Sequence, residues 1–368
     1  MNGLILCTKQ CNLRCKYCFE DSMHKDCTLG LSEIRDMYRV FQDTCLEKFV
    51  SQLAQINRQM GKHASITFHG GEPLMIGAEL LEESCEIIRH FQEFEICMQT
   101  NATLVTPEIA RVMRKYGIKV GVSLDGPKEM NDAYRVSVGA NGTYDTIIRN
   151  IQLMQDAGVT VGALATVTDV TLEDPSGFYN FFKEHNLSFS FNPCFIEPNS
   201  TTGQKGLDID DYIDFYKKMF DIFIEDNASN LNISCFERIL SAMSVKKKVF
   251  MEVCSFIPDC SMTTVAINPA GDFYRCLHYC MDDKNKIGNI LHDPLSLAVG
   301  NMDFSERWST MKETVCAECD IQDFCCGGCP YVAESQNGTI ISKADTCRSQ
   351  KAIVHYIHDY LLQFCRKE

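Results

Sequence analysis

Residues 11–20 read CNLRCKYCFE and place Cys11, Cys15 and Cys18 just after a short apolar run, Leu4–Cys7. Spacings of four and three residues let the three thiols converge from one loop. They can belong to a disulfide, to a zinc site, or to a site that lacks a fourth protein ligand, and structural zinc normally takes four ligands. Cys7 is a possible fourth ligand, but its place in the apolar run favours a buried thiol.

The apolar run is the first of six short strands that alternate with amphipathic helices up to about residue 226. The predicted strands are Leu4–Cys7, Ser65–Phe68, Glu95–Gln99, Lys119–Leu124, Val159–Thr166 and Ser188–Phe191. The predicted helices are Ser32–Gln59, Ala78–Phe91, Pro107–Lys115, Tyr144–Ala157, Ser176–Glu184 and Asp208–Asp226. Six strand-then-helix units predict an α/β fold, a parallel sheet with the helices outside, for which a barrel is one arrangement.

The bulk composition narrows the class of protein. The 368 residues carry a net charge of −14 and contain no basic block, so we expect no nucleic acid as partner. No apolar run reaches membrane-spanning length, and the first ten residues are too polar for a signal peptide, so we expect no membrane and a cytoplasmic location. In such a reducing compartment, clusters among the 21 cysteines indicate metal binding rather than disulfides.

Further motifs follow the next strands. FHGGEP follows the second strand, QTNATL (Gln99–Leu104) the third and SLDGP (Ser123–Pro127) the fourth, with Arg135 just beyond. Paired glycines let a backbone approach a ligand closely, and a glutamate accepts hydrogen bonds from an ammonium group. Taken singly, these motifs are also ordinary glycine, asparagine and aspartate turns. Their position after consecutive strands places them at the edge where α/β folds carry their chemistry.

The C-x3-C-x2-C motif, with an aromatic residue before its last cysteine, closely resembles that of the radical S-adenosylmethionine (SAM) superfamily. The resemblance implies a [4Fe-4S] cluster on Cys11, Cys15 and Cys18, whose open iron binds SAM, and cleavage of SAM to a 5′-deoxyadenosyl radical. HGGEP is similar to the motif that binds the methionyl amine, and the later motifs are similar to positions around the ribose and carboxylate. The implied SAM-binding residues are Phe19, Gly70, Gly71, Glu72, Pro73, Asn101, Ser123 and Arg135.

After residue 233 the sequence predicts a short helix (Cys235–Val245), a hairpin (TTVAINPAGDFYRC) and a terminal helix in SQKAIVHYIHDYLLQF. Eight cysteines in this region resemble the SPASM domain, which carries two auxiliary [4Fe-4S] clusters. The family's crossed ligation implies Cys254, Cys260, Cys276 and Cys329 for one cluster and Cys316, Cys319, Cys325 and Cys347 for the other. Two four-cysteine zinc sites have the same spacing. Cys326 is then spare, and Cys280 has a packing or surface role.

These resemblances divide the chain into three parts. The resemblance implies a partial (β/α)6 barrel of parallel strands at residues 1–226, a bridging region at residues 227–253, and a small cysteine-rich SPASM domain with the terminal helix at residues 254–368. The resemblance implies three clusters in all, one that binds SAM and two auxiliary ones. A cysteine-rich zinc-binding module without enzymatic activity is the alternative class, and a radical SAM enzyme with a small-molecule substrate is another.

The length and the ligand spacing look like those of anaerobic sulfatase-maturating enzymes, which oxidise cysteine or serine to formylglycine. Those enzymes place an aspartate base directly after the cysteine that closes the hairpin, where this chain has Leu277; His278 and Asp282 are nearby substitutes. The histidine of HGGEP looks more like the maturases of ribosomally made peptides. The predicted reaction is therefore a thioether or carbon–carbon crosslink in a small precursor peptide, with formylglycine formation as the alternative.

The resemblance also implies partners. We expect a peptide or protein substrate and a reductant such as flavodoxin or ferredoxin. Many peptide maturases begin with a small domain that grips the leader peptide, whereas this sequence begins directly at the first predicted strand. Leader recognition is then expected from a separate protein or from the barrel mouth.

Overall fold

The computed structural model describes residues 1–18, 29–91, 94–194, 206–226, 230–244, 256–299 and 302–365. Phe19 and Cys254, two of the residues singled out above, lie outside these ranges. So do the end of the predicted helix Cys235–Val245 and the residues that follow it up to 255. In the described part of the chain, no helix is both long enough and apolar enough to cross a membrane.

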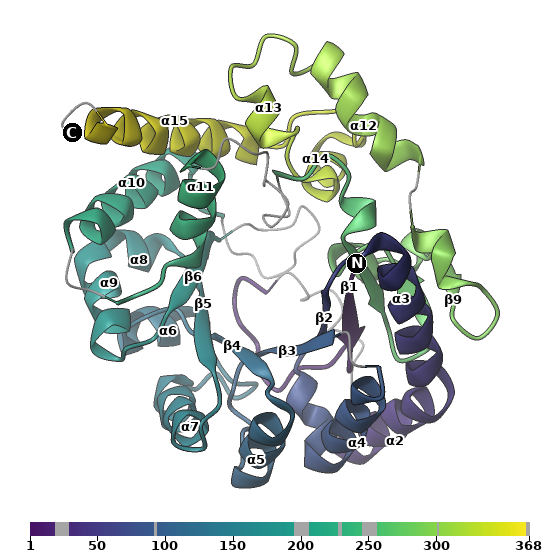
Figure 1. The fold of residues 1–368 in the computed structure, drawn as a ribbon. Coiled ribbons are helices and arrows are strands. Elements are labelled where there is room, and N and C mark those ends of the chain that lie inside the picture. The colour runs from purple at the N-terminus through teal and green to yellow at the C-terminus, as the bar shows by residue number, and fades with distance from the viewer. Residues whose placement is uncertain are drawn as a thin grey trace.

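Nine strands of the described chain form one sheet in the order β6-β5-β4-β3-β2-β1-β7-β8-β9. They are β1 (Asn2–Leu6), β2 (Ala64–His69), β3 (Phe94–Thr100), β4 (Lys119–Ser123), β5 (Val161–Val167), β6 (Phe189–Pro193), β7 (Thr264–Ile267), β8 (Asp272–Tyr274) and β9 (Gly288–Asn289). Strands β1 to β7 pair in parallel, and β8 and β9 are antiparallel. The sheet curves into an open ring (Figure 1), which confirms the predicted partial barrel of six parallel strands.

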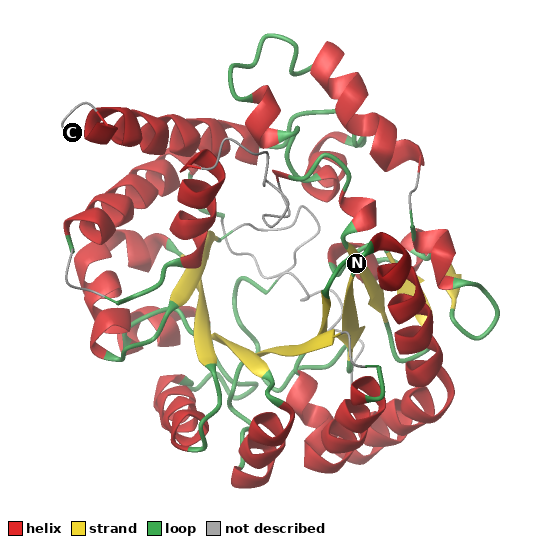
Figure 2. Cartoon of the chain, viewed as in Figure 1, coloured by secondary structure: helices red, strands yellow, loops and turns green. Residues whose placement is uncertain are grey.

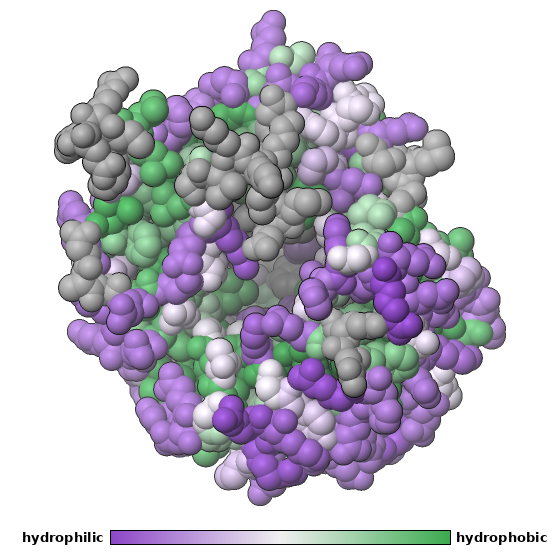
Figure 3. Space-filling view, in the orientation of Figure 1, coloured by the Kyte–Doolittle hydropathy of each residue, from purple (hydrophilic) through white to green (hydrophobic). Residues whose placement is uncertain are grey.

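Helices cover the outside of this sheet (Figure 2). The barrel helices are α2 (Leu31–Phe41), α3 (Glu47–Met60), α4 (Gly77–Arg89), α5 (Pro107–Tyr116), α6 (Lys128–Tyr134), α7 (Tyr144–Asp156), α8 (Asp169–Glu173), α9 (Pro175–Glu184), α10 (Ile209–Glu225) and α11 (Ser234–Ser244). The C-terminal region adds α12 (Met302–Glu313), α13 (Gln322–Cys325), α14 (Pro330–Asn337) and α15 (Thr346–Cys365). Hydrophilic side chains predominate over α2, α4 and α5 on the face seen in Figure 3.

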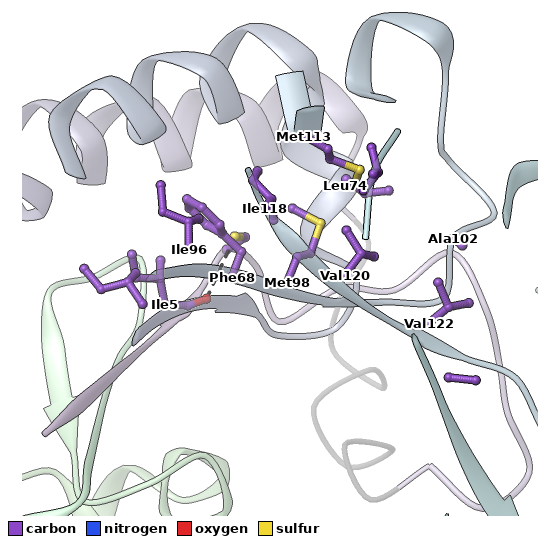
Figure 4. Close-up of a cluster of buried hydrophobic side chains, with 14 of the residues drawn as sticks. Ile5, Phe68, Leu74, Ile96, Met98, Ala102, Met113, Ile118, Val120 and Val122 are labelled. Atoms are coloured by element: carbon purple, nitrogen blue, oxygen red, sulfur yellow. Dashed lines mark hydrogen bonds between the residues drawn. The ribbon is translucent and has the colours of Figure 1, made fainter. Parts of the chain in front are cut away.

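Alternate strand residues build the core between the sheet and the helices. Phe68, Ile96, Met98, Val120 and Val122 are almost completely buried and point toward the helices in Figure 4. Because successive strand side chains point to opposite faces, the residues between them face the inside of the ring. This explains why the strands read as apolar at every second position.

The inner face of the ring is polar and only half-buried. It presents His69, Gln99, Ser123 and Thr166, one from each of four neighbouring strands and each near the carboxyl end of its strand. These side chains differ from the fully buried outer-facing residues in both chemistry and exposure. The fold therefore places polar groups around an open interior, at the edge where parallel α/β sheets carry their sites.

The predicted hairpin is present, but it also extends the barrel sheet. Strand β7 pairs in parallel with β1, with Gly3 opposite Val265, and β8 returns antiparallel to β7. Gly271, at the hairpin turn, has a φ of +82°, and a Cβ there would come within 2.9 Å of the Cys45 sulfur. The hairpin thus belongs to the barrel sheet, and its turn packs against Cys45, which follows helix α2.

Several element boundaries differ from the sequence predictions. The predicted helix Ser32–Gln59 is divided into α2 and α3 by a π-helical turn at Gln42–Leu46, which periodicity alone does not reveal. Helices α6, α8, α12 and α14 were not predicted, because each is short or only weakly amphipathic. The terminal helix was predicted correctly and begins at Thr346.

Helix α15 holds the C-terminal region against the barrel. The ring of Phe220 on α10 lies 5.4 Å from that of Tyr360 and 6.1 Å from that of Tyr356, between ring centroids. The Tyr356 hydroxyl donates to Asp221 at 2.6 Å. These contacts place the cysteine-rich region over the side of the ring where β1 and β6 do not meet (Figure 1).

Candidate active site

The cysteine loop, residues 7–18, follows β1 and is anchored by the loop after β2. Gly71 N–H donates to the Thr8 carbonyl at 2.9 Å, and Glu72 N–H donates to the Gln10 carbonyl at 2.8 Å. A Cβ on Gly71 would lie 2.1 Å from the Gln10 oxygen, and one on Gly70 would lie 2.4 Å from the Thr8 oxygen. The backbone that these glycines approach closely is therefore the chain's own cysteine loop, and the predicted approach to SAM stays a prediction.

Glu72 is completely buried and joins the ends of β2 and β3. Its carboxylate accepts hydrogen bonds from Leu74 N–H at 2.9 Å, the Thr100 hydroxyl at 2.6 Å and Asn101 N–H at 2.8 Å. Burial raises the pKa of Glu72 to about 7, although these hydrogen bonds oppose the shift. The predicted contact between Glu72 and a methionyl amine stays a prediction.

Asn101 joins the cysteine loop to the end of β3. Its amide Nδ2 donates to Asn12 Oδ1 at 3.0 Å and points at the Cys11 sulfur at 3.6 Å. Thr103 closes the network, because its hydroxyl donates to Asn101 Oδ1 and accepts from Asn12. The sequence indicated Asn101 but missed Asn12 and Thr103, although both lie inside the quoted motifs.

Asp125 and Arg135 form a buried ion pair that faces the cysteine loop. Arg135 Nη2 lies 3.1 Å from Asp125 Oδ1, and the two residues are 8% and 1% exposed. The Tyr17 hydroxyl donates to the same carboxylate, and the guanidinium carbon of Arg135 lies 5.3 Å from the centre of the Tyr17 ring. Burial raises the pKa of Tyr17 well above its usual value, so the phenol stays a donor. The sequence predicted Arg135 as a SAM contact but missed Tyr17 and Asp125.

Replacing Asp125 with alanine should lower the free energy of unfolding by about 3–5 kcal/mol, because Arg135 stays buried without its carboxylate. Urea unfolding under anaerobic conditions measures the loss. Asp145→Ala is the matched control, since Asp145 pairs with Lys128 on the surface and is 75% exposed. Its loss should stay below about 1 kcal/mol. Equal losses in the two variants would contradict a buried, energetically important pair.

Ser123 and His69 lie on the inner face of the ring, whereas Cys7 lies in the core outside it. Ser123 Oγ accepts from Gln99 Nε2 at 3.0 Å, across β3 and β4. Cys7 is 1% exposed within the main core, as predicted for a buried thiol. Gly70 N–H donates to His69 Nδ1 at 2.8 Å, so the neutral ring carries its proton on Nε2 and offers a donor to the interior.

The chemistry of the cysteine loop suits thiolate ligands. Leu13 N–H and the Asn101 amide both point at the Cys11 sulfur, at 3.4 and 3.6 Å. Burial raises the pKa of Cys15, but the charge of Arg135 opposes the shift. Cys18 N–H donates to the Cys15 carbonyl at 3.1 Å, which turns the loop between these two residues. Donors and a cation around a sulfur favour its ionised, ligating form.

The four cysteines assigned to the second auxiliary cluster surround one cavity. Cys316, Cys319, Cys325 and Cys347 all line it, together with Gly327 and Gly328. Four thiols that line one cavity are placed to share a bound group, and the choice between a cluster and zinc stays a prediction.

Two described members of the first auxiliary set share one neighbourhood. Cys260 and Cys276 both pack against the buried cluster that contains Leu6, Tyr274 and Tyr279. Cys280 is completely buried among the apolar residues around Leu6 and Tyr274, which agrees with the packing role predicted for it. Cys326 is 4% exposed and has the character of a core thiol.

The structure separates the two base candidates that follow Leu277. Asp282 is exposed, caps a short turn through Lys284 N–H and forms an ion pair with the Lys284 amine at 2.8 Å. His278 is half-buried and stacks on Tyr331, with 4.8 Å between ring centroids. Burial lowers the pKa of both His69 and His278 to about 4. Asp282 is therefore engaged at the surface, whereas His278 is a half-buried ring that packs on Tyr331.

Comparison with known proteins identifies the class. Residues 5–182 match the model of the radical SAM superfamily. This stretch contains the cysteine loop, the buried Glu72 and the Asp125–Arg135 pair, so the N-terminal half of the chain is similar to a radical SAM domain.

Particular relatives extend the match to the whole chain. The cysteine-type anaerobic sulfatase-maturating enzyme of Clostridium perfringens (strain 13 / Type A) is 28% identical over 365 residues, covering 96% of this chain and 94% of the relative. A solved structure described as native anSMEcpe with bound AdoMet and Cp18Cys peptide has a TM-score of 0.80 at 23% identity, covering 100% and 99% of the two chains. Streptococcus suis SuiB bound to S-adenosylmethionine has a TM-score of 0.64 at 18% identity, covering 94% and 76%.

Proposed function

We propose that this enzyme oxidises a cysteine or serine side chain of a peptide or protein substrate to the aldehyde, as in formylglycine formation. The observation that carries the proposal is similarity over nearly the full length of a cysteine-type sulfatase-maturating enzyme. The motifs predicted a peptide crosslink first and formylglycine formation as the alternative. The present proposal puts formylglycine formation first. A domain-level match alone would support neither reaction.

The cofactors proposed are SAM and three [4Fe-4S] clusters. When bound, they supply a 5′-deoxyadenosyl radical and one-electron acceptors. We assign the SAM-binding cluster to Cys11, Cys15 and Cys18, and the second auxiliary cluster to the four thiols around the shared cavity. Cys254, Cys260, Cys276 and Cys329 are proposed for the first auxiliary cluster, within a SPASM domain at residues 254–368.

The chain's own residues have three tasks in this reaction. The loop after β2 and the Asn12–Asn101–Thr103 network hold the cysteine loop at the carboxyl edge of the sheet. The polar inner face binds and orients the substrate side chain, where His69 offers an N–H donor. The substrate side chain would lose a hydrogen atom, one proton and one electron, for which an auxiliary cluster would supply the acceptor. Serine then gives the aldehyde directly, whereas cysteine gives a thioaldehyde that takes up water and releases hydrogen sulfide.

A peptide crosslink is the second candidate, because position 277 is leucine and cannot take a proton. A thioether or carbon–carbon crosslink also removes two hydrogens from the peptide, but it keeps all the sulfur. The fold match to SuiB is compatible with this reaction but does not discriminate between the two. A reductant such as flavodoxin or ferredoxin is proposed for either reaction, and a separate leader-binding protein for the second.

The deciding experiment is an anaerobic assay of reconstituted enzyme with SAM, a reductant and two peptides. One peptide carries a sulfatase-type cysteine motif, and the other is a short peptide encoded beside the gene. Mass spectrometry reads 5′-deoxyadenosine and both peptides. Replacement of sulfur by oxygen in the first peptide supports the proposal. Loss of two hydrogens from the second peptide, with sulfur retained, would overturn it in favour of a crosslink.

Cys276→Ala should still allow some SAM cleavage but lose the peptide product, because Cys276 is proposed as an auxiliary ligand. Cys280→Ala is the matched control, since Cys280 lies four residues on, is fully buried and serves packing. It should keep both activities. Normal product yield from Cys276→Ala would remove the auxiliary cluster from the reaction.

A further inference from the structure

Arg307 is a buried cation in the cysteine-rich region. It lies on α12 and is 2% exposed. Its guanidinium donates to three backbone carbonyls: Ile340 at 2.6 Å, Gly327 at 2.9 Å and Gly328 at 3.1 Å. Across the ranges that the structure describes, it makes no ion pair with a carboxylate. Burying a charge without a counter-charge is costly, so this position calls for an anion nearby.

Two cysteines, one from each proposed set, flank the backbone that Arg307 contacts. Cys325, from the second set, and Cys329, from the first, lie on either side of Gly327 and Gly328, whose carbonyls accept from the guanidinium at 2.9 and 3.1 Å. Thiolate-ligated clusters are anionic, and their potentials depend on nearby charge, hydrogen bonding and solvent exposure. One buried guanidinium is therefore placed to act on two sites.

The backbone that Arg307 holds also connects the two sets. Cys325 lines the shared cavity, Cys329 belongs to the other set, and three residues separate them. All three are left-handed, with φ of +52° at Cys326, +81° at Gly327 and +72° at Gly328. A left-handed run is strained for a residue with a side chain, so it needs outside support. Arg307 supplies that support through the carbonyls of Gly327 and Gly328.

We propose that Arg307 is a positioning residue and a shared counter-charge for the two C-terminal cysteine sets. It holds the turn that spaces Cys325 from Cys329, and its charge stabilises the reduced, more anionic state of both sites. This inference rests on the proposed function, because it takes the two sets to hold iron–sulfur clusters. The sequence offers no direct signal for it, since one arginine in a weakly amphipathic helix looks like a surface residue.

The test uses full-length protein in which Cys11, Cys15 and Cys18 are all alanine, so that bound iron reports only on the C-terminal sets. Iron content and redox titration followed by electron paramagnetic resonance are the two readouts. Arg307→Met should lower the midpoint potential of both clusters, because the reduced state loses its counter-charge. Arg307→Lys keeps the charge and should stay near the parent protein in potential, with lower iron content because lysine cannot hold the carbonyls in a fork.

Arg348→Met is the matched control. Arg348 directly follows Cys347, but it is 64% exposed and pairs with Asp210, so solvent screens its charge. Its removal should leave both potentials unchanged. If Arg307→Met does not fold, Arg307→Gln replaces it as the uncharged variant, and its midpoint potentials are compared with those of Arg307→Lys.

The outcomes distinguish the presence of the proposed clusters from the proposed role of Arg307. Parent protein without iron in the C-terminal sets would overturn the proposed clusters themselves. Iron-loaded Arg307 variants with unchanged potentials and unchanged iron content would overturn the role of Arg307 alone. An equal fall in potential for Arg307→Lys and Arg307→Met would overturn the counter-charge role.

Discussion

Cys11→Ala should abolish SAM cleavage, with no 5′-deoxyadenosine formed above the level of a protein-free reaction. The three cysteines of the loop are proposed to supply every protein ligand of the SAM-binding cluster, so the loss of one leaves too few thiolates to hold it. The structure adds a reason specific to Cys11, because the N–H of Leu13 and the amide of Asn101 both point at its sulfur. Liquid chromatography of the quenched anaerobic reaction measures the nucleoside.

Cys7→Ala is the control for this prediction. Cys7 lies four residues before Cys11 but is 1% exposed in the core and donates toward the Ile5 carbonyl. Removing its sulfur leaves a small cavity and some loss of stability, and SAM cleavage should persist. If Cys11→Ala cleaved SAM at the parent rate, the assignment of the cluster to this loop would be wrong.

Gly71→Ala should have the second largest effect. The N-terminal cluster should be lost although its three proposed ligands, Cys11, Cys15 and Cys18, all remain. The new methyl group would lie 2.1 Å from the Gln10 oxygen and 2.4 Å from the Gln10 carbonyl carbon. Both are backbone atoms of the cysteine loop, so no rotamer change relieves the contact. Overpacking usually lowers the free energy of unfolding by about 1–3 kcal/mol. Here the cysteine loop must move to avoid the new methyl group. Iron content and SAM cleavage, measured on the same preparation, should both fall.

Gly30→Ala provides the comparison. A Cβ at Gly30 would meet only the Glu33 and Ser32 side chains, at 3.6 and 3.9 Å, and the φ of Gly30 is −72°. Iron content and cleavage should match the parent protein. Gly71→Ala protein with full iron content and normal cleavage would show that the loop tolerates displacement, against the role given to the hydrogen bonds from Gly71 and Glu72.

Much of the candidate site was predictable because its motifs are local. Cys11, Cys15 and Cys18 share one loop, Gly70 to Pro73 share another, and each loop follows a strand that the apolar pattern reveals. Parallel strands end at one edge, so strand order alone brings these loops together. Tyr17 and Asp125 lie inside these motifs, but their contacts were missed because the partners are far apart in the sequence. Arg307 was missed because it belongs to no motif. The helix interruption at Gln42–Leu46 was missed because a π turn has no periodic signature.

Spacing and periodicity were enough to predict the class of protein, a parallel α/β sheet and the residues that can ligate metal, because both are properties of neighbours along the chain. How those residues are held depends on the tertiary structure. It showed that Gly70 and Gly71 lie against the cysteine loop, that Arg135 is paired with Asp125, that β7 joins β1, and that Arg307 holds the turn between Cys325 and Cys329. Each of these depends on contacts between residues far apart in sequence, whose energies are set by burial and distance.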